Sequence, residues 1–508
     1  MATQTKEADF RTCPVTTLQV HRPAELLITA NAVTAVVFLT VGGILALLLA
    51  LTRWQAVHLL SADWFYTFLT AHGITMLVFW IVFFEVAGLY FGSSVLLNGR
   101  LVAPKVGWVA FGLMLAGALL AELMIFTGQA DVMFTAYVPL EAHPLFYLGI
   151  ILFAVGALVA VYLFFASVVV AKHERRHTGS LPLVTFGLVV AAIIAAFTLI
   201  SGAITFIPAF FWSVGLLEIY DPAAYRLVFW AFGHSAQQIN LAAMVAIWYA
   251  LATLTVGATP INEKLSRMAF LLYILFINLG SIHHLMVDPG LSVVYKLTNT
   301  SYIMYLAVLG SMIHAYSIPA AVEVAQRAKG YSKGLFQWLW RAPWGEPGFS
   351  ALVVSMVLFG FLGGVSGVIQ GMMQLNMMIH NTIRVVGHFH ATVVGGTTVA
   401  FMGLTYYIIP LIMRRDIISK GLARIQPYVY GSGLFLLIAG MMLSGDMGVP
   451  RRSWDIYATG GAFTTQFPAF TDVTLAMLGI GAIVAVIGGA MFVYLAVFSL
   501  LFGKDLRK

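Results

Sequence analysis

Long apolar runs, separated by short polar segments, constrain the fold of this chain more than any other feature. Inside a bilayer every backbone N–H and C=O group needs a partner from the protein, so a run that crosses the membrane forms a helix or part of a closed barrel. About 20 residues suffice for a helical span. We predict an all-α polytopic membrane protein with about 12 transmembrane helices (12 or 13). The predicted spans are residues 25–52, 62–97, 106–127, 143–172, 181–212, 223–256, 265–286, 292–325, 349–372, 380–414, 428–446 and 470–502.

We predict a single transmembrane domain over residues 25–502, between a cytoplasmic N-terminal segment, residues 1–24, and a cytoplasmic tail, residues 503–508. Composition agrees with this division, because 61% of the residues are hydrophobic and only 9% are charged. In an ordinary soluble domain about a quarter of the residues are charged. No cleavable signal pattern precedes the first long span, so we expect that span to stay as a membrane helix.

Positive charges lie almost entirely on one side of the predicted membrane. If the N-terminus is cytoplasmic, that side receives 21 lysines and arginines, whereas the other side receives Arg53, Arg451 and Arg452. This asymmetry follows the positive-inside rule and predicts a multi-pass protein of the cell inner (cytoplasmic) membrane with a cytoplasmic N-terminus. The formal net charge of +7 therefore reflects topology. We expect a lipid membrane and no nucleic acid as partner.

Six histidines from four predicted spans lie at compatible depths in the outer half of the membrane. One histidine in an apolar helix is more often structural than a ligand, but six together favour a metal or haem site. The chain has one cysteine, Cys13, which excludes a thiolate zinc site and a covalent c-type haem. His314 belongs to no motif and is interpreted as structural. The six histidines are His72, His234, His283, His284, His388 and His390.

The stretch VVGHFHATVV places His388 and His390 two positions apart in one apolar span. On an α-helix, residues i and i+2 are separated by about 200° around the axis. The two imidazoles cannot share a metal, so each requires a partner of its own.

The motifs around these histidines carry a family resemblance. The chain has LTAHG around His72, GH at His234, HH at His283–His284, and HNTIRVVGHFH at residues 380–390. Together they resemble the catalytic subunit, subunit I, of the haem–copper oxidoreductase superfamily, over nearly the whole chain. FTAYVPLEAHPLFYLG, HHLMVDPG and VPRR are similar to the B-family branch of oxygen reductases. The resemblance implies the haem–copper oxidase subunit I fold.

The resemblance also implies cofactors and roles. His72 and His390 would be the axial ligands of a low-spin haem, expected to be haem b, and His388 the proximal ligand of a high-spin haem, b or a-like. Phe389 would offer a short electron path between the two haems. A non-haem metal would be held by His234, His283 and His284. Contacts with the haem propionates would come from Arg451, Arg452, His380 and Asn381.

The chain departs from the oxygen-reducing members at Gln238. Those members usually carry a tyrosine four residues after the first distal-metal histidine, covalently tied to that histidine, where it supplies a proton and an electron. Glutamine can hydrogen-bond a bound ligand but cannot form a stable radical. Tyr225, Tyr249 and Tyr273 do not occupy this position, and a tyrosine from another helix remains an open alternative.

Electron stoichiometry guides the functional prediction. Joining two nitric oxide molecules needs two electrons, which two reduced metals hold, whereas reducing oxygen to water needs four. We therefore predict a nitric oxide reductase in which Gln238, His234, His283, His284 and His388 form the catalytic site. The alternative is a B-family-like terminal oxygen reductase, a cytochrome c oxidase, with a displaced tyrosine or another electron source. A haem-binding sensor or transporter without turnover is a third hypothesis.

The distal metal and the electron donor follow from the same residues. Three neutral imidazoles without a carboxylate favour copper, although iron is possible. The chain lacks CxxCH and a two-cysteine dicopper motif. The resemblance implies a second subunit that carries a dicopper centre or haem c, with cytochrome c or a cupredoxin as donor. A quinol site within this chain is the rival hypothesis.

Overall fold

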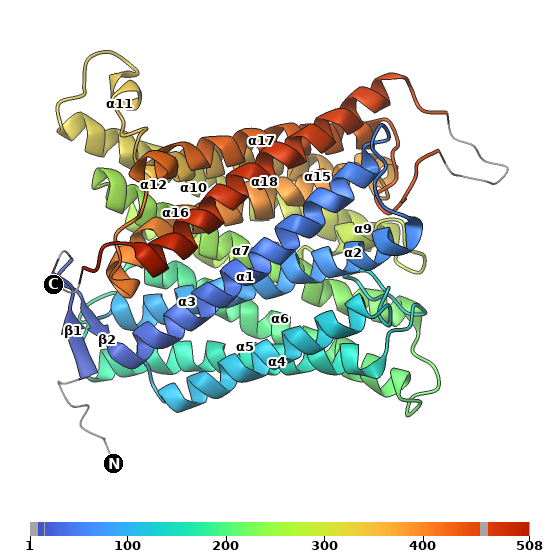
Figure 1. The fold of residues 1–508 in the computed structure, drawn as a ribbon, viewed down its shortest axis with the longest axis horizontal. Coiled ribbons are helices and arrows are strands. Elements are labelled where there is room, and N and C mark those ends of the chain that lie inside the picture. The colour runs from blue at the N-terminus through green and yellow to red at the C-terminus, as the bar shows by residue number, and fades with distance from the viewer. Residues whose placement is uncertain (1–8, 15, 458–465, 507–508) are drawn as a thin grey trace.

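A short β-hairpin and a bundle of long helices make up the fold (Figure 1). The computed structural model describes residues 9–14, 16–457 and 466–506. Parts of the predicted terminal segments, residues 1–8, 15 and 507–508, lie outside the described residues. The hairpin pairs β1 (Phe10–Thr12) with β2 (Gln19–His21) in antiparallel register and leads directly into the first helix.

Eleven helical segments in the described part of the chain are long and apolar enough to cross a membrane, which confirms a multi-pass membrane protein. Several are continuous helices with internal π-helical turns, labelled η. The single-element spans are α1 (Arg22–Arg53), α4 (Pro104–Phe126), α5 (Pro144–His173), α6 (Leu183–Ser213), α7 (Pro222–Val256), α17 (Lys420–Asp446) and α18 (Phe470–Phe502).

Four further spans are composite. The first joins α2 (Ala62–Ile74), η2 (Thr75–Phe79), α3 (Trp80–Tyr90) and η3 (Phe91–Val95); the second joins α9 (Val293–Leu297), η6 (Thr298–Ile303) and α10 (Met304–Ala328). The third joins α12 (Pro347–Val357), η7 (Leu358–Gly364) and α13 (Val365–Gln370); the fourth joins α15 (Ile383–Phe389), η8 (His390–Thr398), α16 (Val399–Ile408) and η9 (Ile409–Met413). The short helices α11 (Gln337–Trp340) and α14 (Met373–Ile379) lie in connections.

The predicted span 265–286 differs from the other spans. Its helix consists of α8 (Glu263–Leu272) and η4 (Tyr273–Ile277), and a separate 3₁₀ turn, η5 (Ile282–Leu285), follows Gly280. Asn299 stabilises this break, because its side chain accepts from Ile282 N at 2.9 Å and donates to Leu279 O at 3.0 Å. The Asn299 side chain thus bonds to a backbone N–H and a backbone C=O group that have lost their helical partners where the helix ends.

The two ends of the chain show that this broken segment completes a twelfth crossing. The hairpin before α1 and the end of α18 lie at the same end of the bundle, on the left in Figure 1. Arg11 of β1 donates to Leu411 O of η9 at 2.7 Å, and Arg415 donates to Gly503 O at 3.2 Å, so both ends meet beside η9. Two chain ends on the same side of a membrane require an even number of crossings, and the broken segment raises the eleven spans of the described chain to twelve. We call the opposite end of the bundle, where α2, α5 and α7 begin, the predicted outer end.

Glycines allow neighbouring helices to approach until their backbones touch. A Cβ atom at Gly440 of α17 would lie 2.6 Å from Leu478 N of α18, and one at Gly433 would overlap the backbone of Ala485. Small residues serve the same purpose at many membrane helix contacts, because close approach increases van der Waals contact. The α17–α18 pair positions one wall of the cavity described below.

We therefore expect Gly433→Ala to destabilise the protein by about 1–3 kcal/mol or more, because the added methyl must displace backbone atoms. The matched control is Gly112→Ala on α4, where an added Cβ meets nothing within 4 Å. Thermal unfolding in detergent measures the difference. Equal unfolding temperatures for the two variants would contradict the close packing of α17 against α18.

Candidate metal and haem centre

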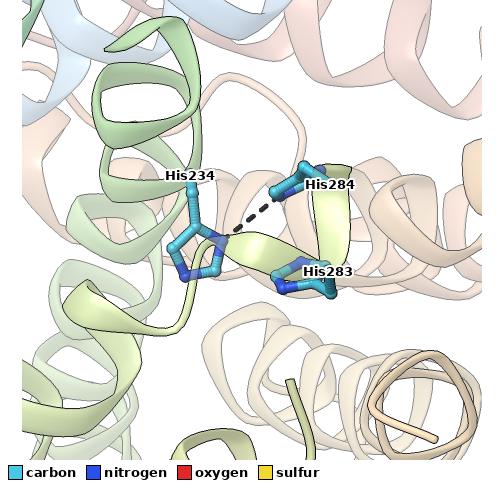
Figure 2. A group of neighbouring side chains, drawn as sticks. All are labelled: His234, His283 and His284. Carbon is cyan, nitrogen blue, oxygen red and sulfur yellow. Dashed lines mark hydrogen bonds between the residues drawn. The ribbon is translucent and has the colours of Figure 1, made fainter. Parts of the chain in front are cut away.

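Three imidazoles converge between α7 and η5. Figure 2 shows His234, which α7 contributes, facing His283 and His284 of the 3₁₀ turn. One potential ligand atom from each residue lies within 4.8 Å of the others. His234 Nδ1 and His284 Nε2 are 3.3 Å apart. Two nitrogens bound to one metal at about 2.0–2.1 Å in tetrahedral geometry are also about 3.3 Å apart, so this group fits a metal ion.

Hydrogen bonds and stacking hold two of these rings in place. His283 Nδ1 lies 2.9 Å from Gly280 O, and a proton donated there leaves Nε2 with its lone pair for a metal. The ring of His284 stacks on Trp230, with centroids 3.7 Å apart and planes inclined by 3°. Trp230 Nε1 donates to the hydroxyl of Tyr137 at 2.6 Å. The break in the helix before η5 is what turns both histidines toward α7.

A second pair of imidazoles lies across a large cavity. His72 of α2 and His390 of η8 have ring centroids 6.3 Å apart and planes inclined by 18°. Two imidazoles that bind one iron from opposite faces, with bonds of about 2 Å, have ring centres about 6 Å apart. His72 Nδ1 lies 3.0 Å from Gly42 O and His390 Nδ1 lies 2.8 Å from Val386 O, which leaves both Nε2 atoms available.

The cavity around this pair has a volume of about 640 Å³ and fits a tetrapyrrole bound by two histidines. Apolar side chains of α1, α2, α17 and α18 form most of its wall, and Phe389 belongs to the same lining. Polar residues at the predicted outer end of the lining include Arg53, Arg451 and Arg452.

His388 has a different neighbourhood from His390. Its Nδ1 lies 2.9 Å from the hydroxyl of Ser366 on α13, and a Cβ at Gly367 would lie 3.1 Å from its Cε1 atom. The helix changes from α to π geometry at His390, directly after Phe389. The two imidazoles therefore have separate hydrogen-bond partners, and His388, unlike His390, does not line the cavity around His72.

Cationic and amide side chains form a cluster at the predicted outer end of the bundle, beside the cavity around His72 and His390. Arg451 donates through its backbone N to Asn381 O at 3.0 Å and through Nη2 to Asn381 Oδ1 at 3.2 Å. Burial is the main reason that the pKa of Arg451 falls to about 10, and it also lowers the pKa of Arg452. The Arg451 guanidinium therefore remains charged at neutral pH. Arg53 joins them by donating to Arg451 O at 2.5 Å.

His380 is a buried, neutral member of this cluster. Burial, followed by the charge of Arg451, lowers the pKa of His380 to about 4. Its Nδ1 lies 3.0 Å from Asn376 Oδ1, and Asn376 Nδ2 donates to His283 O at 3.4 Å. Nε2 of His380 has no hydrogen-bond partner in the described structure. A buried cluster of cations with an unsatisfied imidazole fits the carboxylates of haem propionates.

Gln238 lies beside the three-histidine group. Its side chain is 9% exposed, and its Nε2 lies 3.5 Å from His234 Nε2, the ring nitrogen that faces away from His284. The tyrosines considered from the sequence are engaged elsewhere: Tyr225 donates to Thr135 O, Tyr249 bonds to Ser266 and His314, and Tyr273 pairs with Ser311. None of these three replaces Gln238 beside His234.

Sequence reasoning missed several residues of the site. They had no recognisable motif, because a hydroxyl, amide or indole in an apolar span gives little signal before its neighbours are known. The structure adds Trp230 against His284, Ser366 against His388, Asn299 at the helix break, Asn376 beside His380, and Arg53 in the cavity wall. Of these residues, the sequence indicates only Arg53, as a positive charge on the outer side.

Comparisons with known proteins show the family of the chain. The family model described as "Cytochrome C and Quinol oxidase polypeptide I" matches residues 27–487. Cytochrome c oxidase subunit 1 of Thermus thermophilus is 29% identical over 452 residues, covering 87% of this chain and 77% of that protein. Cytochrome c oxidase polypeptide 1 of Halobacterium salinarum is 25% identical, covering 79% and 66%. A solved haem–copper terminal oxidase dimer matches with a TM-score of 0.90 at 26% identity, covering 96% of this chain and 86% of that chain. The chain belongs to the haem–copper oxidase subunit I family of membrane oxidoreductases.

Proposed function

We propose that this protein is the catalytic subunit of a nitric oxide reductase that converts two NO to N₂O at a high-spin haem and a non-haem metal. The observation that carries the proposal is Gln238, whose amide lies 3.5 Å from His234 where a tyrosine would otherwise stand. The reaction, 2 NO + 2 e⁻ + 2 H⁺ → N₂O + H₂O, needs no electron from a side chain. An amide can orient His234 and hydrogen-bond a nitrogen oxide, but it supplies no electron.

The histidines divide between three cofactors in this proposal. His72 and His390 would hold the low-spin haem, for which we propose haem b, and His388 would hold the high-spin haem, b or a-like. His234, His283 and His284 hold the metal, for which copper is favoured and iron is possible. The bound cofactors supply one-electron redox chemistry. The chain orients the imidazoles through Gly42, Val386, Gly280 and Ser366, while Phe389 separates the haem ligands.

Buried polar side chains support proton delivery from the predicted inner end. Tyr249 on α7 bonds to Ser266 of α8 at 2.9 Å and to His314 Nδ1 of α10 at 3.0 Å. Tyr273 of η4 pairs with Ser311 of α10 at 3.2 Å. His314, interpreted from the sequence as structural, belongs to this polar group, which can pass protons between hydroxyl and imidazole.

The surroundings of the subunit complete the proposal. We place the protein in the cell inner membrane with a cytoplasmic N-terminus, with residues 25–502 as its transmembrane domain and residues 1–24 and 503–508 on the cytoplasmic side. Arg451, Arg452, His380 and Asn381 would contact haem propionates. Electrons would enter through a second subunit bearing a dicopper centre or haem c, reduced by cytochrome c or a cupredoxin.

A second candidate, a B-family-like terminal oxygen reductase, has its own support. The relatives quoted above are named cytochrome c oxidases, and the matched solved structure is described as a terminal oxidase. Trp230 stacks on His284 and donates to Tyr137, so an oxidisable aromatic pair lies directly behind one proposed metal ligand. In this candidate the pair would supply the electron that Gln238 cannot.

The cofactor assignment predicts two haems and one non-haem redox metal per chain. Pyridine haemochrome analysis and elemental analysis of the purified protein measure these ratios. His283→Ala should lose the non-haem metal and retain both haems, because it removes one of three ligands. A single haem in the wild type, or zinc as its only non-haem metal, would contradict the assignment.

The division of the HFH motif predicts opposite spectra for its two histidines. His390→Ala, like His72→Ala, should remove the low-spin haem spectrum and leave a haem that binds carbon monoxide, whereas His388→Ala should do the reverse. His314→Ala is the control for the spectra, since it replaces a membrane histidine that lines neither the cavity around His72 and His390 nor the three-histidine group. Loss of the low-spin spectrum alone in His388→Ala would show that the two roles are reversed.

The substrate assignment predicts that the purified enzyme reduces nitric oxide faster than oxygen when an artificial donor supplies electrons. Gln238→Ala should lower nitric oxide turnover about 10- to 100-fold, as is typical when a residue that orients a metal ligand is lost, while all three metals remain. Ser235→Ala, which removes a buried hydroxyl on the same helix turn, is the control. Clean four-electron oxygen reduction that exceeds nitric oxide turnover would refute the assignment in favour of the second candidate.

A further inference from the structure

The two histidines that η5 contributes to the metal site follow one another in the chain. Consecutive side chains point about 100° apart on an α-helix and about 120° apart on a 3₁₀-helix, so they do not normally face one partner. The rings of His283 and His284 nevertheless have centroids 4.1 Å apart, and these centroids lie 4.9 Å and 5.4 Å from that of His234 (Figure 2). The path of the chain through the turn therefore decides whether the three imidazoles converge.

A turn of four residues cannot fix its own position in the bundle. Short helical segments are marginal by themselves, because few hydrogen bonds offset the ordering of the backbone. The helix formed by α8 and η4 ends before η5 begins, so it does not hold the turn as a continuous rod. Contacts from other spans have to hold the segment from Leu279 to Asp288 in place.

Asn299 of η6 holds this segment before the histidines. The residue is 6% exposed. Its side-chain oxygen accepts from Ile282 N at 2.9 Å, and its Nδ2 donates to Leu279 O at 3.0 Å. An amide that accepts one bond and donates another restricts both the distance and the direction of the bound chain. Asn299 thus joins the end of the break to the first residue of the turn.

Lys296 of α9 holds the same segment after the histidines. Its ammonium donates to Met286 O at 2.8 Å and to Asp288 O at 2.7 Å. Hydrogen bonds from a charged donor are about twice as strong as neutral ones. Lys296 and Asn299 are three residues apart on one composite span, which places them on the same helix face. That face therefore contacts the chain on both sides of the histidine pair.

The end of the segment is also tied to the helix that carries His234. The Asp288 carboxylate pairs with Arg226 of α7 through two hydrogen bonds, at 2.7 Å and 2.6 Å. Arg226 precedes His234 by eight residues on that helix, which is about 12 Å along its axis. Lys296 therefore holds the backbone of a residue whose side chain is already bound to α7, so the segment is placed relative to His234 as well.

We infer that Lys296 and Asn299 are positioning residues for the non-haem metal. Neither belongs to the three-histidine group, but together they fix the two ends of the segment that presents His283 and His284 to His234. Ligands that are held in place before the metal binds lose less freedom on binding, which raises the affinity of the site. The inference rests on the metal site of the proposed function and not on the gas that the enzyme reduces.

Competition between the purified holoenzyme and a copper chelator tests the inference, with an iron chelator in its place if elemental analysis finds iron. Asn299→Leu and Lys296→Met each remove the hydrogen-bonding group and keep a side chain of similar length. We expect each variant to bind the non-haem metal about 10- to 100-fold more weakly, the range for loss of a residue that orients metal ligands. The low-spin haem spectrum should stay intact and shows that the variant is folded.

Thr300→Val is the matched control for these variants. It removes a buried hydroxyl of the same π-helical turn, and this hydroxyl has no hydrogen-bond partner in the described residues. Its metal affinity should equal that of the wild type. Wild-type metal affinity in either Asn299→Leu or Lys296→Met, with an intact low-spin haem, would overturn the inference. A wild type without any non-haem metal would instead contradict the metal site of the proposed function.

Lys296→Arg separates positioning by hydrogen bonds from a general effect on stability. A guanidinium also donates to carbonyl groups, so Lys296→Arg should retain most of the metal affinity that Lys296→Met loses. Lys296 is partly exposed, so these two variants keep the inference testable if Asn299→Leu does not fold. Equal metal affinities of Lys296→Arg and Lys296→Met would overturn it.

Discussion

The turn from α15 into η8 holds two imidazoles, two residues apart, against different parts of the bundle. His390 faces His72 with ring centres 6.3 Å apart, while His388 bonds to Ser366. Neither ring can change direction without leaving its partner, because each Nδ1 is already held by a hydrogen bond. The positions of α2 and α13 around this helix depend on that divergence. The positions of the two proposed haems depend on it as well.

The need for hydrogen-bond partners also explains the other polar residues of the site. A polar group in hydrocarbon needs a partner, and most of the site residues have one: His283 has Gly280 O, Asn299 caps a broken helix, and Trp230 has Tyr137. One exception is informative. His380 Nε2 lacks a partner within the described residues, and we assign it to a haem propionate.

The sequence predicted those features that have a strong periodic or motif signal. Apolar run length located the spans, and the spacing of the HFH motif required two separate partners for His388 and His390. It did not predict the break at Gly280, because apolar residues continue through 265–286 and the break depends on Asn299 from another span. It also did not predict Trp230 or Ser366 as neighbours of the histidines, since their roles arise from tertiary contacts that no local pattern encodes.

The central claim is that no side chain supplies an electron to the binuclear site, because Gln238 occupies the position beside His234. The most direct measurement mixes enzyme holding only two electrons, one on each metal of that site, with oxygen, followed by product analysis and electron paramagnetic resonance. The account predicts hydrogen peroxide, the two-electron product of O₂ and two protons, with no protein radical. Absence of hydrogen peroxide together with a tyrosyl or tryptophanyl radical, which Tyr137 or Trp230 would carry, would contradict it.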